Sequence, residues 1–306
     1  MEFRHLVSFI AIAEELHFGK AAARLHLTQP SLSAQLQKLE KSLGVQLVAR
    51  NSHEVRLTSA GEAFEAHARL IVQQMEKATN TAQSTAAGMC GSLSVGYNMP
   101  AGRHILPTAM ARMSNEHPDI SISLWEKRTG PQLAALLDGS LDCALAYGRP
   151  HGPQFRHRRL LANIPIVAIV GRGHRWAGRK AARFSELASE KCLMFTRDQT
   201  PAMYDAIHGA AADSGIELTV AQSADDPGAT AQMVSVKPIV GFASLPRAVA
   251  VGLGASGPDP VAVKLVDPVP AIDLYAVWRA DETSVAVHNF LGCLDAVDSE
   301  PHRLVG

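Results

Sequence analysis

The chain has 306 residues with 29 basic and 29 acidic side chains, so no global positive charge indicates a nucleic-acid partner. A content of 47% hydrophobic and 19% charged residues is typical of a soluble globular protein and excludes a disordered or fibrous one. No apolar run reaches the about 18 residues of a membrane span, and the start of the chain does not resemble a secretory signal, so we expect a cytoplasmic protein without membrane contact.

Two helices are predicted at the start of the chain. Apolar side chains recur every three or four positions between Phe3 and Ala13, which is the period of a helix with one buried face, and this helix is expected over residues 2–16. A second, short helix is expected from Phe18 to about Leu27. Its alanines would let another helix cross it closely.

A third helix is predicted to begin after Thr28 and to end at Gly44, since threonine is a good N-cap and proline is tolerated in the first turn. Its leucines fall on one face and leave Gln, Ser and Lys side chains on the others. Such a helix after a short helix and a tight turn suits readout of the DNA major groove, although a plain three-helix bundle with a solvated face has the same periodicity. The residues expected to contact DNA are Gln29, Pro30, Ser31, Ser33, Gln35, Gln37 and Lys38.

The next stretch predicts a hairpin. Val45–Val48 and Val55–Leu57 are strand-like and flank a polar turn, which is the pattern of a wing. Its Arg50 and Arg56 are expected to lie near the phosphate backbone.

A dense pattern extends from the second predicted helix to the end of the hairpin. It consists of Ala21-Ala22-Ala23-Arg24-Leu25-His26-Leu27-Thr28-Gln29-Pro30-Ser31-Leu32-Ser33, then Gln35, Leu39-Glu40, Leu43-Gly44, Leu47, Arg50 and Leu57-Thr58-Ser59-Ala60-Gly61. This pattern resembles the DNA-binding signature of LysR-type transcription regulators. The resemblance implies a winged helix-turn-helix domain over residues 1–58 that binds double-stranded DNA. One departure is Val48, where the family commonly has a bulkier Phe or Leu, and a smaller core residue is expected to cost stability before recognition.

One long helix is predicted from Thr58 to about Gly88, within a linker of residues 59–90. Ser59 and Glu62 have the spacing of a capping box. Apolar residues then alternate in steps of four and three, which is the seam of a two-helix coiled coil between protomers, although one amphipathic helix packed on its own domain is the alternative. The predicted seam consists of Phe64, Ala68, Ile71, Met75 and Ala78. The resemblance implies dimers that assemble into a homotetramer.

Strand-like and helical segments alternate through residues 91–306, as in open α/β folds. Strands are expected over residues 92–97, 120–125, 141–147, 164–170, 192–196, 239–245 and 272–278, and helices over 103–116, 130–139 and 283–296. The resemblance implies a two-lobed, periplasmic-binding-protein-like effector-binding domain with a small-molecule inducer between the lobes. Lobe I would comprise about residues 91–162 and 268–306, and lobe II about 163–267.

Ligands of open α/β folds bind at the carboxyl ends of strands, and helix N-termini at such junctions suit a carboxylate. Either of two loop arginines is a candidate clamp for an acid, although a loop arginine is usually solvated or paired locally. The expected effector-binding residues are Asn98, Met99, Pro100, Thr129, Arg149, Phe195, Arg197 and Pro201.

The segment 195–205 is similar to regulators of aromatic-acid breakdown within the family, so the expected inducer is a small, aromatic carboxylic acid. The sequence differs from the family pattern just before a predicted strand of lobe II. Relatives often carry Val-Ala-Ala-Gly-Leu-Gly there, whereas this chain has Lys237 and Pro238. The proline is expected to end a helix early, and the lysine to bring a charge near the cleft.

No catalytic residues, cofactor or metal are expected, because the chain has no GxSxG, P-loop, HExxH or Rossmann glycine pattern. The four cysteines, Cys90, Cys143, Cys192 and Cys293, match no zinc spacing and are expected to be unpaired thiols, with a redox-sensing pair as the alternative. The rival functions are a constitutive DNA-binding protein without an inducer and a cytoplasmic solute-binding module. RNA polymerase is a further candidate partner.

Overall fold

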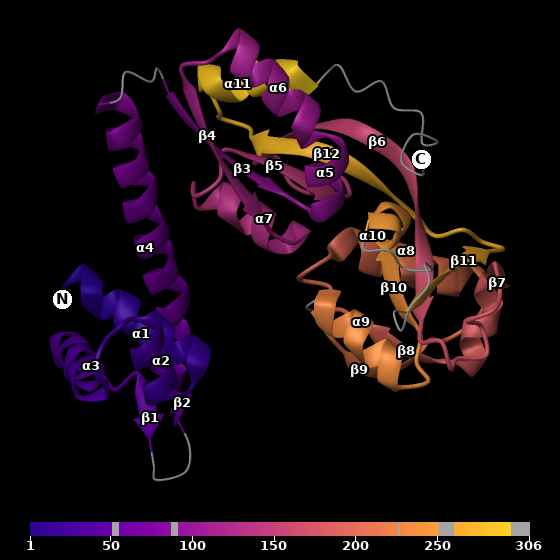
Figure 1. Ribbon diagram of the computed structural model, residues 1–306, viewed down its shortest axis with the longest axis horizontal. Helices are drawn as coiled ribbons and strands as arrows, with labels where there is room; N and C mark the ends of the chain where they lie inside the picture. The colour runs from indigo at the N-terminus through magenta and orange to yellow at the C-terminus, as the bar shows by residue number, and fades with distance from the viewer. Residues whose placement is uncertain (51–54, 87–90, 226, 251–259, 295–306) are drawn as a thin grey trace. The chain divides into compact units, whose positions relative to one another are not determined.

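The computed structural model describes residues 1–50, 55–86, 91–225, 227–250 and 260–294. The chain divides into two compact units, Met1–Ala87 and Gly88–Gly306 (Figure 1). Among the described residues, no helix combines the length and the apolar character that a membrane span requires.

Three helices and a hairpin build the N-terminal unit: α1 (Phe3–Glu15), α2 (Phe18–Arg24), α3 (Gln29–Leu43), β1 (Val48–Arg50) and β2 (Val55–Leu57). The apolar faces of the three helices meet in one core, which also buries Val48. β1 and β2 are antiparallel, with Val48 opposite Leu57. The first wing strand was expected at residues 45–48 and instead begins at Val48. The reason is that the N–H groups of Leu47 and Val48 donate to the Glu40 carboxylate, at 2.8 and 3.1 Å, before pairing starts.

The long helix α4 (Ser59–Ala86) begins against this hairpin. The Gly61 N–H donates to Thr58 Oγ1 at 3.0 Å, and the Thr58 hydroxyl donates to the Gln46 carbonyl at 2.7 Å. Thr58 therefore caps the helix, which corrects the predicted capping box at Ser59. A Cβ on Gly61 would lie 2.1 Å from the Leu47 carbonyl oxygen, so the glycine permits this close approach.

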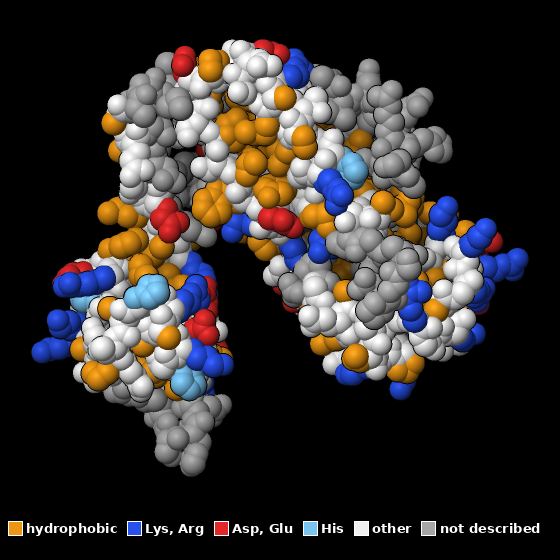
Figure 2. Space-filling model, viewed as in Figure 1, with side chains coloured by type: hydrophobic (Ala, Val, Ile, Leu, Met, Phe, Trp, Pro, Cys, Tyr) orange, Lys and Arg blue, Asp and Glu red, His pale blue; other side chains and the backbone are white. Residues whose placement is uncertain are grey.

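The first half of α4 packs on its own unit. Ala68 is fully buried in the core, and the Phe64 ring lies 5.5 Å from that of Phe9. The prediction that Ala68 belongs to the seam is therefore wrong, because its own unit covers it, whereas Phe64 is half-buried and its place in the seam stays a prediction. Farther along, Ile71 and Met75 are 43% and 52% exposed, and hydrophobic side chains are visible on the surface of the helix (Figure 2).

The C-terminal unit is built on a mixed eight-stranded sheet of order β4-β3-β5-β12-β6-β11-β7, with β10 also paired to β6. The strands are β3 (Gly91–Tyr97), β4 (Ile120–Glu126), β5 (Cys143–Tyr147), β6 (Phe155–Val170), β7 (Ala181–Arg183), β10 (Gly241–Ser244), β11 (Val261–Val266) and β12 (Ala271–Arg279). A separate parallel pair consists of β8 (Lys191–Met194) and β9 (Thr219–Ser223). The half with β3, β4 and β5 is called lobe I, and the half with β8, β10 and β11 is called lobe II.

Strand β6 belongs to both lobes (Figure 1). Its residues 155–165 pair with β12, and its residues 166–170 pair with β10 and β11. The sequence predicted this strand only from Ile164, because the basic stretch Arg156–Arg159 hides the apolar pattern of a strand.

Helices cover both lobes: α5 (Met99–His104), α6 (Leu106–Glu116), α7 (Thr129–Leu137), α8 (Pro201–Asp213), α9 (Pro227–Val236), α10 (Leu245–Ala250), α11 (Val285–Leu294) and the short 3-10 helix η1 (Phe184–Ser189). The helix predicted over residues 103–116 is divided at Ile105. Pro107 lies in the first turn of α6 and has no N–H to continue the bonding of α5. Residues 295 and 296 of the last predicted helix lie outside the described residues.

We predict that Gly61→Ala lowers the free energy of unfolding of the N-terminal unit by about 1–3 kcal/mol, because the added methyl overpacks the contact with Leu47. Gly209→Ala on α8 is the matched control, since nothing lies within 4 Å of its added Cβ. That change should stabilise its helix by about 0.5–1 kcal/mol. Urea unfolding followed by circular dichroism measures both, and an undiminished stability of Gly61→Ala would contradict the proposed close packing.

Candidate functional sites

Helix α3 presents polar side chains on the surface of the N-terminal unit. The Ser31 N–H donates to Thr28 Oγ1 at 3.4 Å, which fixes the start of the helix. Most of the predicted DNA-contacting residues lie at the surface: Gln29, Pro30, Gln37 and Lys38 are exposed, and Ser31 and Ser33 are half-buried. Amide, hydroxyl and ammonium groups in this arrangement suit base edges and phosphates.

Gln35 has a second role within the unit. Its Oε1 accepts a hydrogen bond from the buried Ser8 hydroxyl at 2.6 Å and so joins α3 to α1. Gln35 is half-buried, and its contact with DNA stays a prediction. Its spacing, three residues after Leu32 and four before Leu39, could have placed it beside the buried face.

Of the two arginines of the predicted wing, the structure describes the side chain of one. Arg56 lies on β2 and is exposed. Arg50 ends β1, but its side chain and residues 51–54 lie outside the described residues.

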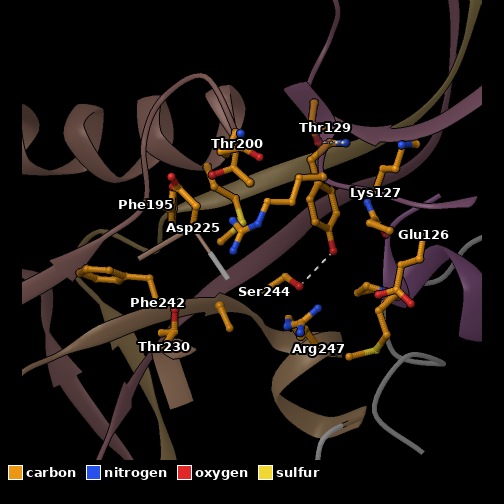
Figure 3. Close-up of a pocket in the computed structure, with 18 of the residues that line it drawn as sticks. Glu126, Lys127, Thr129, Phe195, Thr200, Asp225, Thr230, Phe242, Ser244 and Arg247 are labelled. Atoms are coloured by element: carbon orange, nitrogen blue, oxygen red, sulfur yellow. Dashed lines mark hydrogen bonds between the residues drawn. The ribbon is translucent and has the colours of Figure 1, made fainter. Parts of the chain in front are cut away.

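A cavity of about 460 Å³ lies between lobe I and lobe II, and we call it the inter-lobe cavity (Figure 3). Lobe I contributes Asn98, Met99, Pro100, Glu126, Lys127, Arg128, Thr129 and Tyr147. The rest of the wall comes from Ile169 on β6 and, in lobe II, from Phe195, Gln199, Thr200, Met203, Asp225, Thr230, Phe242, Ala243, Ser244 and Arg247.

Predicted effector residues from both lobes meet at this cavity, namely Asn98, Met99, Pro100, Thr129 and Phe195. Asn98 caps α5 through Oδ1, which accepts the Ala101 N–H at 3.0 Å. Within the described part of the chain, the buried Asn98 Nδ2 and Thr200 Oγ1 atoms have no hydrogen-bond partner. Both atoms can donate to a ligand oxygen.

Hydrogen bonds join the two lobes beside the cavity. The Tyr147 hydroxyl of lobe I donates to Ser244 Oγ of lobe II at 3.0 Å, as Figure 3 shows. Within lobe I, the Tyr147 N–H donates to Thr129 Oγ1 at 3.1 Å. Burial raises the pKa of Tyr147 to about 12, so its phenol is protonated and donates at neutral pH. The Gly130 N–H donates to the Gln199 carbonyl at 3.0 Å, and a Cβ on Gly130 would lie 1.7 Å from the Asp198 carbonyl oxygen.

The cavity wall holds more cationic than acidic side chains. The lining contains the cations Lys127, Arg128 and Arg247 and the acids Glu126 and Asp225. Asp225 Oδ1 also accepts the N–H and the hydroxyl of Thr196, at 2.7 and 3.0 Å. The sequence did not predict any of these three cations, although Lys127 and Arg128 lie two and three residues after the strand predicted over residues 120–125, where the strand-end rule would have selected them.

Arg149, Arg197 and Pro201 were predicted to bind the effector and do not line the cavity. Arg197 Nε and Nη2 donate to the two Asp205 carboxylate oxygens at 2.7 and 2.8 Å, which lowers the pKa of Asp205. The predicted acid clamp at Arg197 is thus corrected, because α8 already supplies its carboxylate. Arg149 is exposed, and Pro201 opens α8.

Lys237, at the position that departs from the family pattern, does not line the cavity either. Helix α9 ends at Val236, ahead of Pro238, as predicted. Lys237 is exposed, and its ammonium donates to Gln222 Oε1 at 2.8 Å. The prediction that Lys237 brings a charge near the cleft is therefore wrong.

The described cysteines do not favour redox sensing. Cys143, Cys192 and Cys293 are buried and unpaired. Burial raises the pKa of Cys143 and of Cys192 to about 12 and also raises that of Cys293. The thiolate is the reactive form, so these thiols suit packing better than oxidation. Cys90 lies outside the described residues.

Comparison with known proteins gives two family matches. The model of the LysR substrate binding domain matches residues 86–298, and that of the bacterial regulatory helix-turn-helix protein, lysR family, matches residues 3–62. The HTH-type transcriptional regulator IlvR of Caulobacter vibrioides is 30% identical over 305 residues, which cover 98% of this chain and 100% of IlvR. A hydrogen peroxide-inducible genes activator of Pectobacterium carotovorum is 34% identical over 194 residues, 63% of this chain and 64% of the activator.

Solved structures give the same picture. The crystal structure of CbnR, a LysR family transcriptional regulator, is 25% identical and superposes with a TM-score of 0.67, covering 98% of this chain and 100% of CbnR. Full-length CbnR complexed with its target DNA gives a TM-score of 0.64 at 25% identity, covering 97% of this chain and 100% of CbnR.

We predict that Tyr147→Phe and Ser244→Ala each lower the free energy of unfolding of the C-terminal unit by about 0.5–1.5 kcal/mol, because each removes the bond between the lobes. The double variant should lose less than the sum of the two, and additive losses would contradict a direct bond.

This bond should also make the stability depend on pH. Since the pKa of Tyr147 is raised to about 12, its contribution to the free energy of unfolding is present below the ordinary pKa near 10 and disappears as the pH rises through 12. Urea unfolding at several pH values measures this loss, which Tyr147→Phe should lack.

Proposed function

Because this chain belongs to the LysR family of transcription regulators, we propose that α3 and the wing read an operator sequence while the inter-lobe cavity binds a small organic acid that controls transcription. The chain is a DNA-binding regulator with an effector-binding domain, and it is not an enzyme. The observation that carries the proposal is a cavity with an excess of cationic side chains in a chain that also carries a polar recognition helix.

The side chains on α3 suit direct readout of bases. A glutamine can pair with adenine through two hydrogen bonds, and a serine can pair with several base edges. Gln29 and Ser33 are assigned this role, whereas Lys38 and the wing arginines, Arg50 and Arg56, are assigned to phosphates. Pro30, Ser31 and Gln37 complete the proposed contact surface. The solved complex of CbnR with its target DNA supports this use of the fold.

The chemistry of the cavity favours an acid with an apolar body. Its volume of about 460 Å³ is typical of a small-molecule site. Lys127, Arg247 and the unpartnered Asn98 amide suit a carboxylate, while Phe195 and Phe242 offer apolar walls. An aromatic carboxylic acid fits this combination. By binding one arrangement of the lobes more tightly than the other, the ligand would shift the chain toward that arrangement and so change its DNA binding.

Peroxide is the less favoured effector. The hydrogen peroxide-inducible activator among the relatives raises this alternative. The described cysteines of this chain are buried with raised pKa values, whereas a redox-sensing cysteine needs an accessible thiolate. The organic acid is therefore the proposal.

Helix α4 is proposed to join two copies of the chain. Ile71, Met75 and Ala78 are exposed at heptad spacing beyond the part of α4 that packs on its own unit. A second α4 would remove these side chains from water. The resulting pair of DNA-binding domains suits two half-sites, and tetramer assembly and contact with RNA polymerase are extensions of this proposal.

We predict that Gln29→Ala or Ser33→Ala weakens binding to the specific operator by about 1–3 kcal/mol and hardly changes binding to a scrambled duplex. Fluorescence anisotropy with DNA from upstream of the chain's own gene measures both affinities. Arg56→Ala is the control and should weaken both about equally, because a phosphate contact carries no sequence information. Equal losses on both duplexes for Gln29→Ala would refute base readout by α3.

We predict that one member of a panel of small acids, including benzoate and muconate, raises the melting midpoint of the full chain. A ligand at 100 times its Kd adds about 2.7 kcal/mol to the free energy of unfolding. Arg247→Gln and Asn98→Ala should reduce the shift, whereas Arg197→Gln, an arginine outside the cavity, should preserve it. A panel in which no acid raises the midpoint would favour the constitutive DNA-binding protein.

A further inference from the structure

One group of side chains outside the inter-lobe cavity has the composition of a metal site. Helices α6 and α11 pack side by side in lobe I, as Figure 1 shows. Near their C-terminal ends they bring together Glu116, His117 and Cys293, whose ligand atoms all lie within 4.8 Å of one another. These residue types are those that bind zinc in proteins.

The three side chains of this cluster differ in burial. Cys293 is 1% exposed, His117 is half-buried, and Glu116 is exposed. Tetrahedral zinc with ligands at about 2.0–2.3 Å places ligand atoms roughly 3.4–3.6 Å apart. To bind one ion, the three ligand atoms would have to approach one another from separations of up to 4.8 Å, through side-chain rotations of Glu116 and His117 toward Cys293.

A neighbouring side chain orients the histidine. Asn289 lies one turn before Cys293 on α11, and its amide Nδ2 is 3.2 Å from His117 Nδ1. With the amide flipped, its oxygen accepts the Nδ1–H and leaves the lone pair of Nε2 for a metal. Such a partner for the second ring nitrogen is what metal-binding histidines have.

The local charges also favour a cation. α6 ends here, and helix C-termini carry partial negative charge. The cationic Arg112 already lies at this position. Its Nη1 is 3.4 Å from the Gly292 and Cys293 carbonyl oxygens, and its Nε donates to Glu116 Oε1 at 3.1 Å. Glu116 Oε2 is the second carboxylate oxygen of this side chain and can bind an ion.

We propose that Glu116, His117 and Cys293 bind one divalent zinc ion, with water as the fourth ligand and Asn289 as a positioning residue; the Cys293 thiol releases its proton to solvent as the metal binds. A thiolate and an imidazole in one site select zinc over magnesium or calcium, which prefer oxygen ligands. The ion would fasten the end of α6 to the end of α11. The sequence predicted no metal here, because Cys293 lies far from His117 along the chain and neither belongs to a recognised ligand spacing.

The test uses the untagged full-length chain after treatment with a chelator. Zn²⁺ titration against a competing chromophoric chelator should give one ion per chain and a raised melting midpoint. Co²⁺ as the probe should give a thiolate-to-cobalt charge-transfer band. His117→Gln and Cys293→Ala should abolish that band and weaken zinc binding by more than about 100-fold, and Asn289→Ala should weaken it about 10- to 100-fold.

His288→Gln is the matched control, because His288 is an exposed histidine on α11 outside the cluster. It should leave the zinc affinity unchanged. Circular dichroism shows whether each variant is folded, and His117→Gln and Asn289→Ala decide the question if Cys293→Ala does not fold. Absence of stoichiometric binding, or binding that His117→Gln leaves intact, would overturn the proposal.

Discussion

Strand β6 carries the chain from lobe I to lobe II of the C-terminal unit, and residues 267–270 carry it back from β11 to β12. Because β6 pairs with β12 in lobe I and with β10 and β11 in lobe II, the backbone hydrogen bonds of both lobes meet along one segment. The cavity wall includes Ile169 of this strand, and the hydrogen bonds from Tyr147 to Ser244 and from Gly130 to Gln199 join the lobes beside it. A ligand in the cavity therefore touches the elements that fix the lobes relative to each other, which is the physical basis of the proposed switch.

The N-terminal unit depends on a different set of contacts, made mostly by the residues of the family signature. Glu40 holds the backbone before β1, and Thr58 both bonds to that backbone and caps α4. Gly61 lets the helix approach the Leu47 carbonyl. Many signature residues thus maintain the framework, and the side chains assigned to DNA contact, such as Gln29 and Lys38, are placed by it.

The sequence predicted the element types well where periodicity and caps were strong, as in α3 between Thr28 and Gly44. It did not predict the tertiary contacts of single side chains. Gln35 bonds to a buried hydroxyl and Arg197 to a neighbouring helix, and neither partner could be identified from local spacing. The strand-end rule placed Asn98 and Thr129 in the cavity wall, but Arg247 follows β10 and was missed. The juxtaposition of His117 and Cys293 arises from helix packing and has no local signal.

In the proposed function, one chain couples ligand binding in the cavity to operator binding. Coupling of two sites is reciprocal, so a ligand that changes operator affinity must have its own affinity changed by operator DNA to the same extent. The decisive measurement is the affinity and footprint of the full chain on its upstream DNA, with and without the acid that raises its melting midpoint. The account predicts a change on the operator that a scrambled duplex does not show and that Asn98→Ala reduces. A ligand that stabilises the chain and leaves both the operator affinity and the footprint unchanged would contradict it.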